Sequence, residues 1–98
     1  MLASSSVRVG GFDVPLPLAA ETQPQSHATM TLLQVDAGMA RQQQQAYRAW
    51  ALSNGLSVVS ETDTVTGWSL VLNRGAEVLI FTCFYEPRAT LCIQVDAD

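Results

Sequence analysis

The spacing of apolar residues changes at Asn54-Gly55, and this change limits the folds open to the chain. Before this point, Met39, Tyr47 and Trp50 recur at the spacing of one helix face. After it, apolar and polar residues alternate in successive short runs, as they do in strands. A single helix followed by consecutive strands predicts an α+β domain, with the helix packed on one face of a four- to five-stranded, mostly antiparallel sheet.

The helix is predicted over residues 37–53. Asp36 is placed to cap its N-terminus, and Asn54-Gly55 is a typical C-terminal stop. The glutamine run then forms an exposed helical surface with good helix propensity. Gln43 is the exception, because the helical spacing puts it on the inward stripe beside Tyr47.

Two loops are predicted to set the register of the later strands. The sequence "NRG" at 73–75 suits a three-residue hairpin loop, and "EPRA" at 86–89 suits a four-residue one. They pair Leu70 with Val78 and Phe84 with Leu91. The predicted strands are residues 30–35, 56–62, 67–73, 76–85 and 89–96. The side chains predicted to face the helix are Trp68, Leu70, Leu72, Val78, Ile80, Phe84, Leu91, Ile93 and Val95.

The N-terminal part of the chain is predicted to be extended. Pro15 and Pro17 lack a backbone donor, which excludes a central strand at 12–18. The apolar residues of that segment alternate, so we expect an extended apolar segment lying along the sheet. Residues 1–11 are small and polar, which predicts a flexible terminus before a single domain at 12–98, and residues 22–29 are predicted to form a loop.

Composition excludes several classes of protein. A chain of 98 residues with 48% hydrophobic and 14% charged residues has one core and is not disordered. Five arginines and no lysine stand against nine acidic residues, a net charge of −4 that works against nucleic-acid binding. No apolar run approaches the ~20 residues that cross a bilayer, so we expect no membrane partner. The first residues do not resemble a secretory signal, and we expect a cytoplasmic protein.

The predicted register leaves a second sheet face that is largely apolar, so something is expected to cover it. The candidates are the N-terminal segment, a second copy of the chain or a ligand. We expect the segment to cover part of the face and self-association the rest, although a different protein partner would fit the same surface. The predicted interface residues are Val71, Leu79, Phe81, Cys83, Tyr85, Cys92 and Gln94.

Cys83 and Cys92 fall opposite each other in this register, within disulfide reach. They are interpreted either as a reducible pair or as two buried thiols, and a reducing compartment favours thiols. Two cysteines and the single histidine, His27, lack a fourth ligand for zinc. The sequence contains no catalytic constellation, and we expect neither a metal nor a cofactor.

A second hypothesis concerns the helix–sheet boundary. Its polar and aromatic residues would line a small-molecule pocket, or they would simply form the core. These residues are Gln43, Tyr47, Trp50 and Trp68. The sequence therefore predicts, first, a non-enzymatic homodimeric association module, second, a small-molecule-binding domain and, third, a cysteine-based redox switch.

Overall fold

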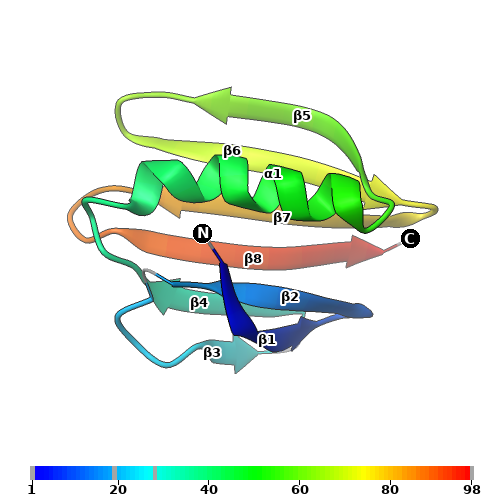
Figure 1. The fold of residues 1–98 in the computed structure, drawn as a ribbon, viewed down its shortest axis with the longest axis horizontal. Helices are drawn as coiled ribbons and strands as arrows, with labels where there is room; N and C mark the ends of the chain where they lie inside the picture. Colours follow the sequence, from blue (N-terminus) through cyan, green and yellow to red (C-terminus); the bar gives the residue numbers. More distant parts are fainter. Residues whose placement is uncertain (1, 19, 28, 98) are drawn as a thin grey trace.

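The computed structural model describes residues 2–18, 20–27 and 29–97, and it has the predicted α+β architecture (Figure 1). Every strand pairing is antiparallel, and six strands form the main sheet in the order β3-β4-β8-β7-β6-β5. The sheet is therefore wider than predicted. The elements are β1 (Leu2–Val9), β2 (Phe12–Pro17), β3 (Gln25–His27), β4 (Met30–Gln34), η1 (Ala40–Gln42), α1 (Gln43–Ser53), β5 (Ser57–Asp63), β6 (Gly67–Arg74), β7 (Glu77–Phe84) and β8 (Thr90–Ala97).

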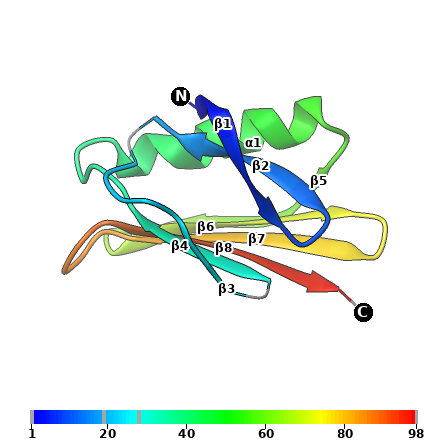
Figure 2. The ribbon, with the colours of Figure 1, turned by 90° about the horizontal axis from the view of Figure 1, so that it is seen from below.

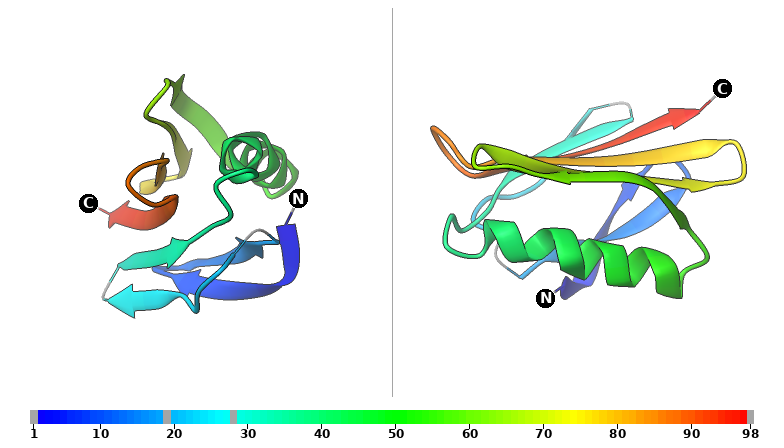
Figure 3. Two further views of the ribbon diagram at one scale, coloured as in Figure 1. Left: turned by 90° about the vertical axis from the view of Figure 1, so that its left-hand side faces the viewer. Right: turned by 90° about the horizontal axis from the view of Figure 1, so that it is seen from above.

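The layers of the fold lie on one side of the main sheet. Helix α1 and the β1–β2 hairpin both pack against the same sheet face, and the opposite face carries no described element (Figures 2 and 3). The main core fills the space between them and includes Val14, Tyr47, Trp68, Leu70, Leu72, Leu79, Phe81, Leu91 and Ile93. Helix α1 has eleven residues, and no helix in the described part of the chain is long and apolar enough to span a membrane.

The N-terminal segment is a hairpin and not an isolated extended strand. Residues 2–9, expected as a flexible terminus, form β1 and pair with β2 across a tight Gly10-Gly11 turn. Gly10 has φ +60°, a conformation that glycine adopts without strain. Tyr47 donates a hydrogen bond of 2.7 Å to the Pro15 carbonyl, and the Arg74 guanidinium lies 4.5 Å from the centre of the Phe12 ring. The hairpin therefore covers the helix side of the sheet and does not cover the second face.

Helix α1 ends where predicted but begins later. A 3₁₀ turn precedes it, and the Asp36 carboxylate accepts a 3.0 Å hydrogen bond from the Gly38 amide in the preceding turn, so Asp36 is not the helix cap. At the other end Gly55 has φ +79°, and the Leu56 amide donates to the Ala51 carbonyl. The predicted stop at Asn54-Gly55 is confirmed.

The register predicted between β6 and β7 is wrong by three residues. The turn is the two-residue Gly75-Ala76, because Arg74 pairs with Glu77, and Leu70 consequently lies opposite Phe81 instead of Val78. A slip by an odd number of residues exchanges the two faces of a strand. The side chains on β7 that point to the helix are therefore Leu79, Phe81 and Cys83, and the predicted inward residues Val78, Ile80 and Phe84 point away from it.

A second slip compensates the first on β8. The β7–β8 loop has five residues, 85–89, instead of four, so Phe84 pairs with Thr90 and not with Leu91. Because each slip inverts the parity, two slips restore it. Leu91, Ile93 and Val95 are buried on the helix side, as predicted.

Two buried acidic protons are expected to make the fold sensitive to alkaline pH. Burial raises the pKa of Cys83 to about 11 from its ordinary 9.0, and raises the pKa of Tyr47 above its ordinary 10.0. At a pH above these ordinary values the unfolded chain loses protons that the folded protein keeps. The contribution of these groups to the free energy of unfolding is therefore complete below pH 9 and decreases as the pH rises above it. The slope approaches about 1.4 kcal/mol per pH unit for each group. Urea unfolding at pH 7 and pH 10.5 measures the loss of unfolding free energy. Tyr47→Phe should make this loss smaller. Equal urea midpoints of the wild-type protein at the two pH values would contradict the prediction.

Candidate functional site

The face of the main sheet opposite α1 and the β1–β2 hairpin is the candidate functional surface, and we call it the outer face. Side chains alternate between the two faces along β4, β6, β7 and β8. Every second side chain therefore lies on the outer face, and the residues next to it in the strand are buried on the helix side. Its apolar members are Met30, Leu32, Val71, Val78, Ile80, Phe84 and Cys92, and its polar members include Ser69, Asn73, Thr82, Thr90 and Gln94.

The strand register lines these side chains up in rows across the sheet. In one row Val71 pairs with Ile80, Ile80 with Gln94, and Gln94 with Met30. A neighbouring row runs from Ser69 through Thr82 and Cys92 to Leu32. Each row therefore crosses four strands and contains no charged side chain.

The charged side chains near the sheet belong to its helix side. Asp63 and Glu61 on β5 face the helix side. Arg41 of η1 lies 3.1 Å from the Asp63 carboxylate, and Arg48 of α1 lies 3.6 Å from that of Glu61. On the four central strands, as far as the structure describes them, Asp96 at the end of β8 is the one charged residue with outward parity. A solvated sheet face is normally much more polar than this.

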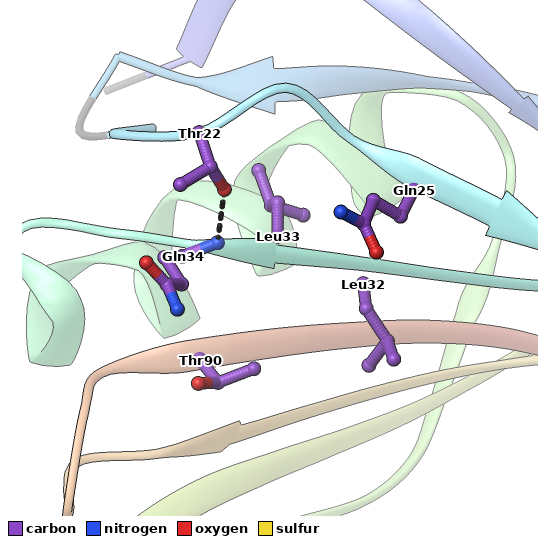
Figure 4. Close-up of a pocket in the computed structure, with 6 residues that line it drawn as sticks. All are labelled: Thr22, Gln25, Leu32, Leu33, Gln34 and Thr90. Atoms are coloured by element: carbon purple, nitrogen blue, oxygen red, sulfur yellow. Dashed lines mark hydrogen bonds between the residues drawn. The ribbon is translucent and has the colours of Figure 1, made fainter.

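A shallow pocket of about 240 Å³ opens on the outer face near β3 and β4 (Figure 4). The chain pairs at Ala20 with Val35, directly after β4, and at Gln25 with Leu32 of β4. It bulges between these points, where Pro24 has no amide to donate. The Thr22 hydroxyl closes the bulge by accepting a 2.9 Å hydrogen bond from the backbone amide of Gln34. We call this the outer-face pocket; its lining residues are Thr22, Gln25, Leu32, Leu33, Gln34 and Thr90.

The two cysteines do not form the predicted pair. Cys83 pairs with Leu91 and is buried on the helix side, whereas Cys92 pairs with Thr82 and is half-buried on the outer face. The sheet itself separates the two sulfur atoms, so a bridge between them is excluded in this fold. Burial raises the pKa of both thiols, which disfavours the thiolate that nucleophilic or redox chemistry needs.

The predicted interface residues divide between the two sides of the sheet. Val71, Cys92 and Gln94 lie on the outer face. Leu79 and Phe81, like Cys83, are fully buried in the core, so the prediction that they are interface residues is wrong. Tyr85 also belongs to the helix side, where the Arg41 guanidinium lies 5.0 Å from the centre of its ring and burial is the main cause that raises its pKa.

The predicted helix–sheet pocket is occupied by close packing. The Tyr47 ring lies 4.3 Å from that of Phe81, and Trp50 meets the same two rings edge-on. Trp68 donates a 2.9 Å hydrogen bond to the Ala40 carbonyl, which satisfies its indole nitrogen. These contacts make the aromatic residues parts of the core, and the polar atoms of Tyr47 and Trp68 donate to backbone carbonyls.

Gln43 is the exception in this core. It is 1% exposed, and neither its amide nitrogen nor its amide oxygen has a hydrogen-bond partner in the structure. Its neighbour Gln44 is the opposite case, since its amide nitrogen donates to the carbonyls of Thr62 at 2.8 Å and Ser69 at 3.1 Å. The two glutamines thus provide a matched pair of buried amides, one unpaired and one paired.

Gln43→Leu is expected to stabilise the protein by about 1–2 kcal/mol. The change removes a buried amide without removing any hydrogen bond, and the two side chains are of similar size. Gln44→Leu is expected to destabilise it by a similar amount, because two carbonyls lose their donor. Chemical unfolding of both variants measures the difference, and a destabilised Gln43→Leu would show that this amide is satisfied in solution.

Sequence reasoning missed several residues of the outer face, namely Ile80, Phe84 and the polar residues of the outer-face pocket. The missing signal was the length of the β6–β7 turn, which decides the side on which each β7 residue lies.

Within residues 2–18, 20–27 and 29–97 no three His, Cys, Asp or Glu side chains come together as metal ligands. The outer face therefore presents apolar and hydroxyl or amide groups, which suit packing against another surface. No protein-family model, curated protein or solved structure matches the chain.

Proposed function

We propose that this protein is a non-enzymatic association module and that two copies pair through their outer faces. The observation that carries the proposal is a broad sheet face that no described element covers and that is uncharged along its central rows. In a sandwich of two sheets, such faces interdigitate and form a core about 10 Å thick. Pairing would remove from water the side chains of Met30, Leu32 and Phe84, which are 37%, 41% and 55% exposed.

The size of the outer face suits a stable dimer. Five spacings of about 4.8 Å separate the two edge strands, and eight residues at about 3.3 Å each span about 26 Å. The projected area is therefore on the order of 600 Å², and the accessible area of a pleated, side-chain-covered face is larger. A standard interface buries about 800 Å² from each partner.

Charge favours a second copy as the occupant. The chain carries a net charge of −4, so two copies repel each other over most of their surfaces. The outer face avoids this repulsion, because Glu61 and Asp63 of β5 are held on the helix side by Arg48 and Arg41. A basic partner would gain nothing from the uncharged central rows, whereas an identical face places no charge against them; Asp96, at the exposed end of β8, lies outside these rows.

The cysteines support a role without covalent chemistry. They lie on opposite sides of the sheet, and burial raises the pKa of each, so neither is placed as a nucleophile with a base. Two thiols that do not pair agree with a reducing compartment such as the cytoplasm.

Native mass over a dilution series tests the proposal. Light scattering is expected to give twice the chain mass of 10.6 kDa at about 100 μM, with dissociation on dilution and no dependence on reductant. A mass of one chain at that concentration would overturn self-association, and would leave the outer face for a different protein.

A further inference from the structure

Phe84 is the aromatic residue that the outer face leaves unshielded. It is 55% exposed, and its cross-strand neighbour on β6 is Gly67, which has no side chain to cover it. A phenylalanine that is fully buried removes about 150–250 Å² of surface from water, so an exposed ring is a strong source of binding energy. Hot spots of protein interfaces are typically bulky side chains that fill pockets.

A pocket lies at the same level of the sheet. Phe84 pairs with Thr90, and Thr90 pairs with Gln34, so the three residues form one row across β7, β8 and β4. Thr90 and Gln34 line the outer-face pocket. Phe84 and the pocket thus lie about 10 Å apart, two strand spacings, on opposite sides of β8.

Two-fold symmetry brings each Phe84 to the pocket of the other copy. In a face-to-face dimer the symmetry axis lies in the interface plane, and an axis along β8 places β7 of one copy over β4 of the other. The strands of the two sheets then run in nearly the same direction, which is a preferred way for sheets to pack. The same axis leaves β5 outside the overlap, in agreement with its sequence, in which five of seven residues are polar and exposed.

We propose that Phe84 of each subunit enters the outer-face pocket of its partner, around a two-fold axis that runs along β8. This inference rests on the proposed self-association and specifies its geometry. The pocket volume of about 240 Å³ is sufficient, because a cavity of about 150 Å³ already binds benzene. Leu32 provides the apolar surface for the ring, and the uncharged Gln25 and Gln34 pack their methylene groups beside it.

The axis has two further geometric consequences. The two copies of Asp96, at the exposed end of β8, face each other at the rim of the interface. Cys92 lies on the outer face of β8, so the two copies of this residue face each other across the axis. Packed sheets are about 10 Å apart, which exceeds the ~7 Å between Cα atoms that a disulfide tolerates. The two thiols are therefore too far apart to form a disulfide with each other, and the packed interface shields both from solvent.

Alkylation of Cys92 by N-ethylmaleimide tests the axis. The alkylation rate of Cys92 is expected to fall at least about ten-fold between a dilute, monomeric sample and a concentrated, dimeric one, because the axis buries this thiol in the interface. Cys83 is buried on the other side of the sheet in both samples and serves as an internal control. Ile80→Glu, which should be monomeric, is expected to keep the fast rate at both concentrations. A native dimer whose Cys92 reacts as fast as in the monomer would overturn the axis while leaving self-association intact, and a monomeric protein would overturn both.

A double-mutant cycle tests the contact itself. Phe84→Ala and Leu32→Ala are each expected to raise the dimer dissociation constant at least about ten-fold. The double variant should be scarcely weaker than the worse single variant, because each change removes the same contact between subunits. Within one subunit the two side chains are two strands apart, and residues at such a distance act independently. Fully additive effects would overturn the placement of Phe84 in the pocket.

Discussion

Gly67→Ala is expected to lower the free energy of unfolding by about 3 kcal/mol, the largest effect we predict for a single methyl group. Gly67 begins β6 opposite Phe84, and a Cβ at this position would overlap the carbonyl oxygen of Cys83 on β7. The obstacle is backbone, which cannot rotate away, so the two central strands must separate locally. For a chain of this length the loss corresponds to a fall in Tm of roughly 15 °C, measured by thermal unfolding.

Gly38→Ala is the matched control. It adds the same methyl group in the turn after Asp36, where the nearest atom is the Asp36 carboxylate oxygen at an ordinary 3.5 Å. Its stability is expected to stay within about 0.5 kcal/mol of wild type. Equal stabilities of the two alanine variants would contradict the close approach of β6 and β7.

Ile80→Glu is expected to raise the dissociation constant of the dimer more than about 100-fold. Ile80 sits in the middle of the outer face, in the row between Val71 and Gln94, where a partner sheet would remove it from water. Two carboxylates, one from each copy, would then be buried without partners at a cost of about 3 kcal/mol or more. In the isolated subunit the same side chain points into solvent, so the variant should fold. Sedimentation measures the association, and circular dichroism confirms the fold.

Leu52→Glu provides the comparison for this variant. Leu52 is 58% exposed on α1, on the other side of the molecule from the outer face. The substitution is chemically equivalent and adds the same negative charge, yet it should leave the dissociation constant unchanged within about two-fold. Equal weakening by both variants would mean that net charge, and not the outer face, controls association.

The helix and the order of the later strands were readable from the sequence because their signals are local. Asn54-Gly55 ends α1 through a glycine with positive φ, and the alternation after it gives β6 and β8 their correct inward residues. The parity of β7 was not readable. Residues 78–81 are apolar without interruption, so either set of alternate residues suits a buried face, and a turn one residue shorter reverses the choice.

The N-terminal hairpin shows a different kind of failure. Gly10-Gly11 between the alternating segments at 7–9 and 12–14 is a typical two-residue hairpin turn, but the serines at 4–6 suggested a flexible end. Val9 and Val14 are buried against the rest of the core, and this tertiary contact overrides the polar composition of the segment. Because the hairpin lies beside α1, the outer face is left uncovered.

For the candidate site, the sequence correctly predicted an apolar second face, but it assigned the wrong residues of β7 to that face because the assignment depended on the strand register. An apolar second face was expected and is present, but its members on β7 are Val78, Ile80 and Phe84 instead of Leu79 and Phe81. The outer-face pocket was beyond sequence reasoning. It arises from a bulge at residues 22–24 whose shape depends on pairing with β4, a contact that no local pattern encodes.

Isotope-filtered NMR on a mixture of ¹³C-labelled and unlabelled chains tests the central claim most directly, since it detects contacts between copies and no others. Self-association through the outer face predicts intermolecular NOEs from the methyl groups of Ile80, Leu32 and Met30, which lie on that face. The methyl groups of Leu52 and of the buried Leu72 should give none. A dimer whose intermolecular NOEs come from Leu52, or a mixture that shows none at all, would contradict the account.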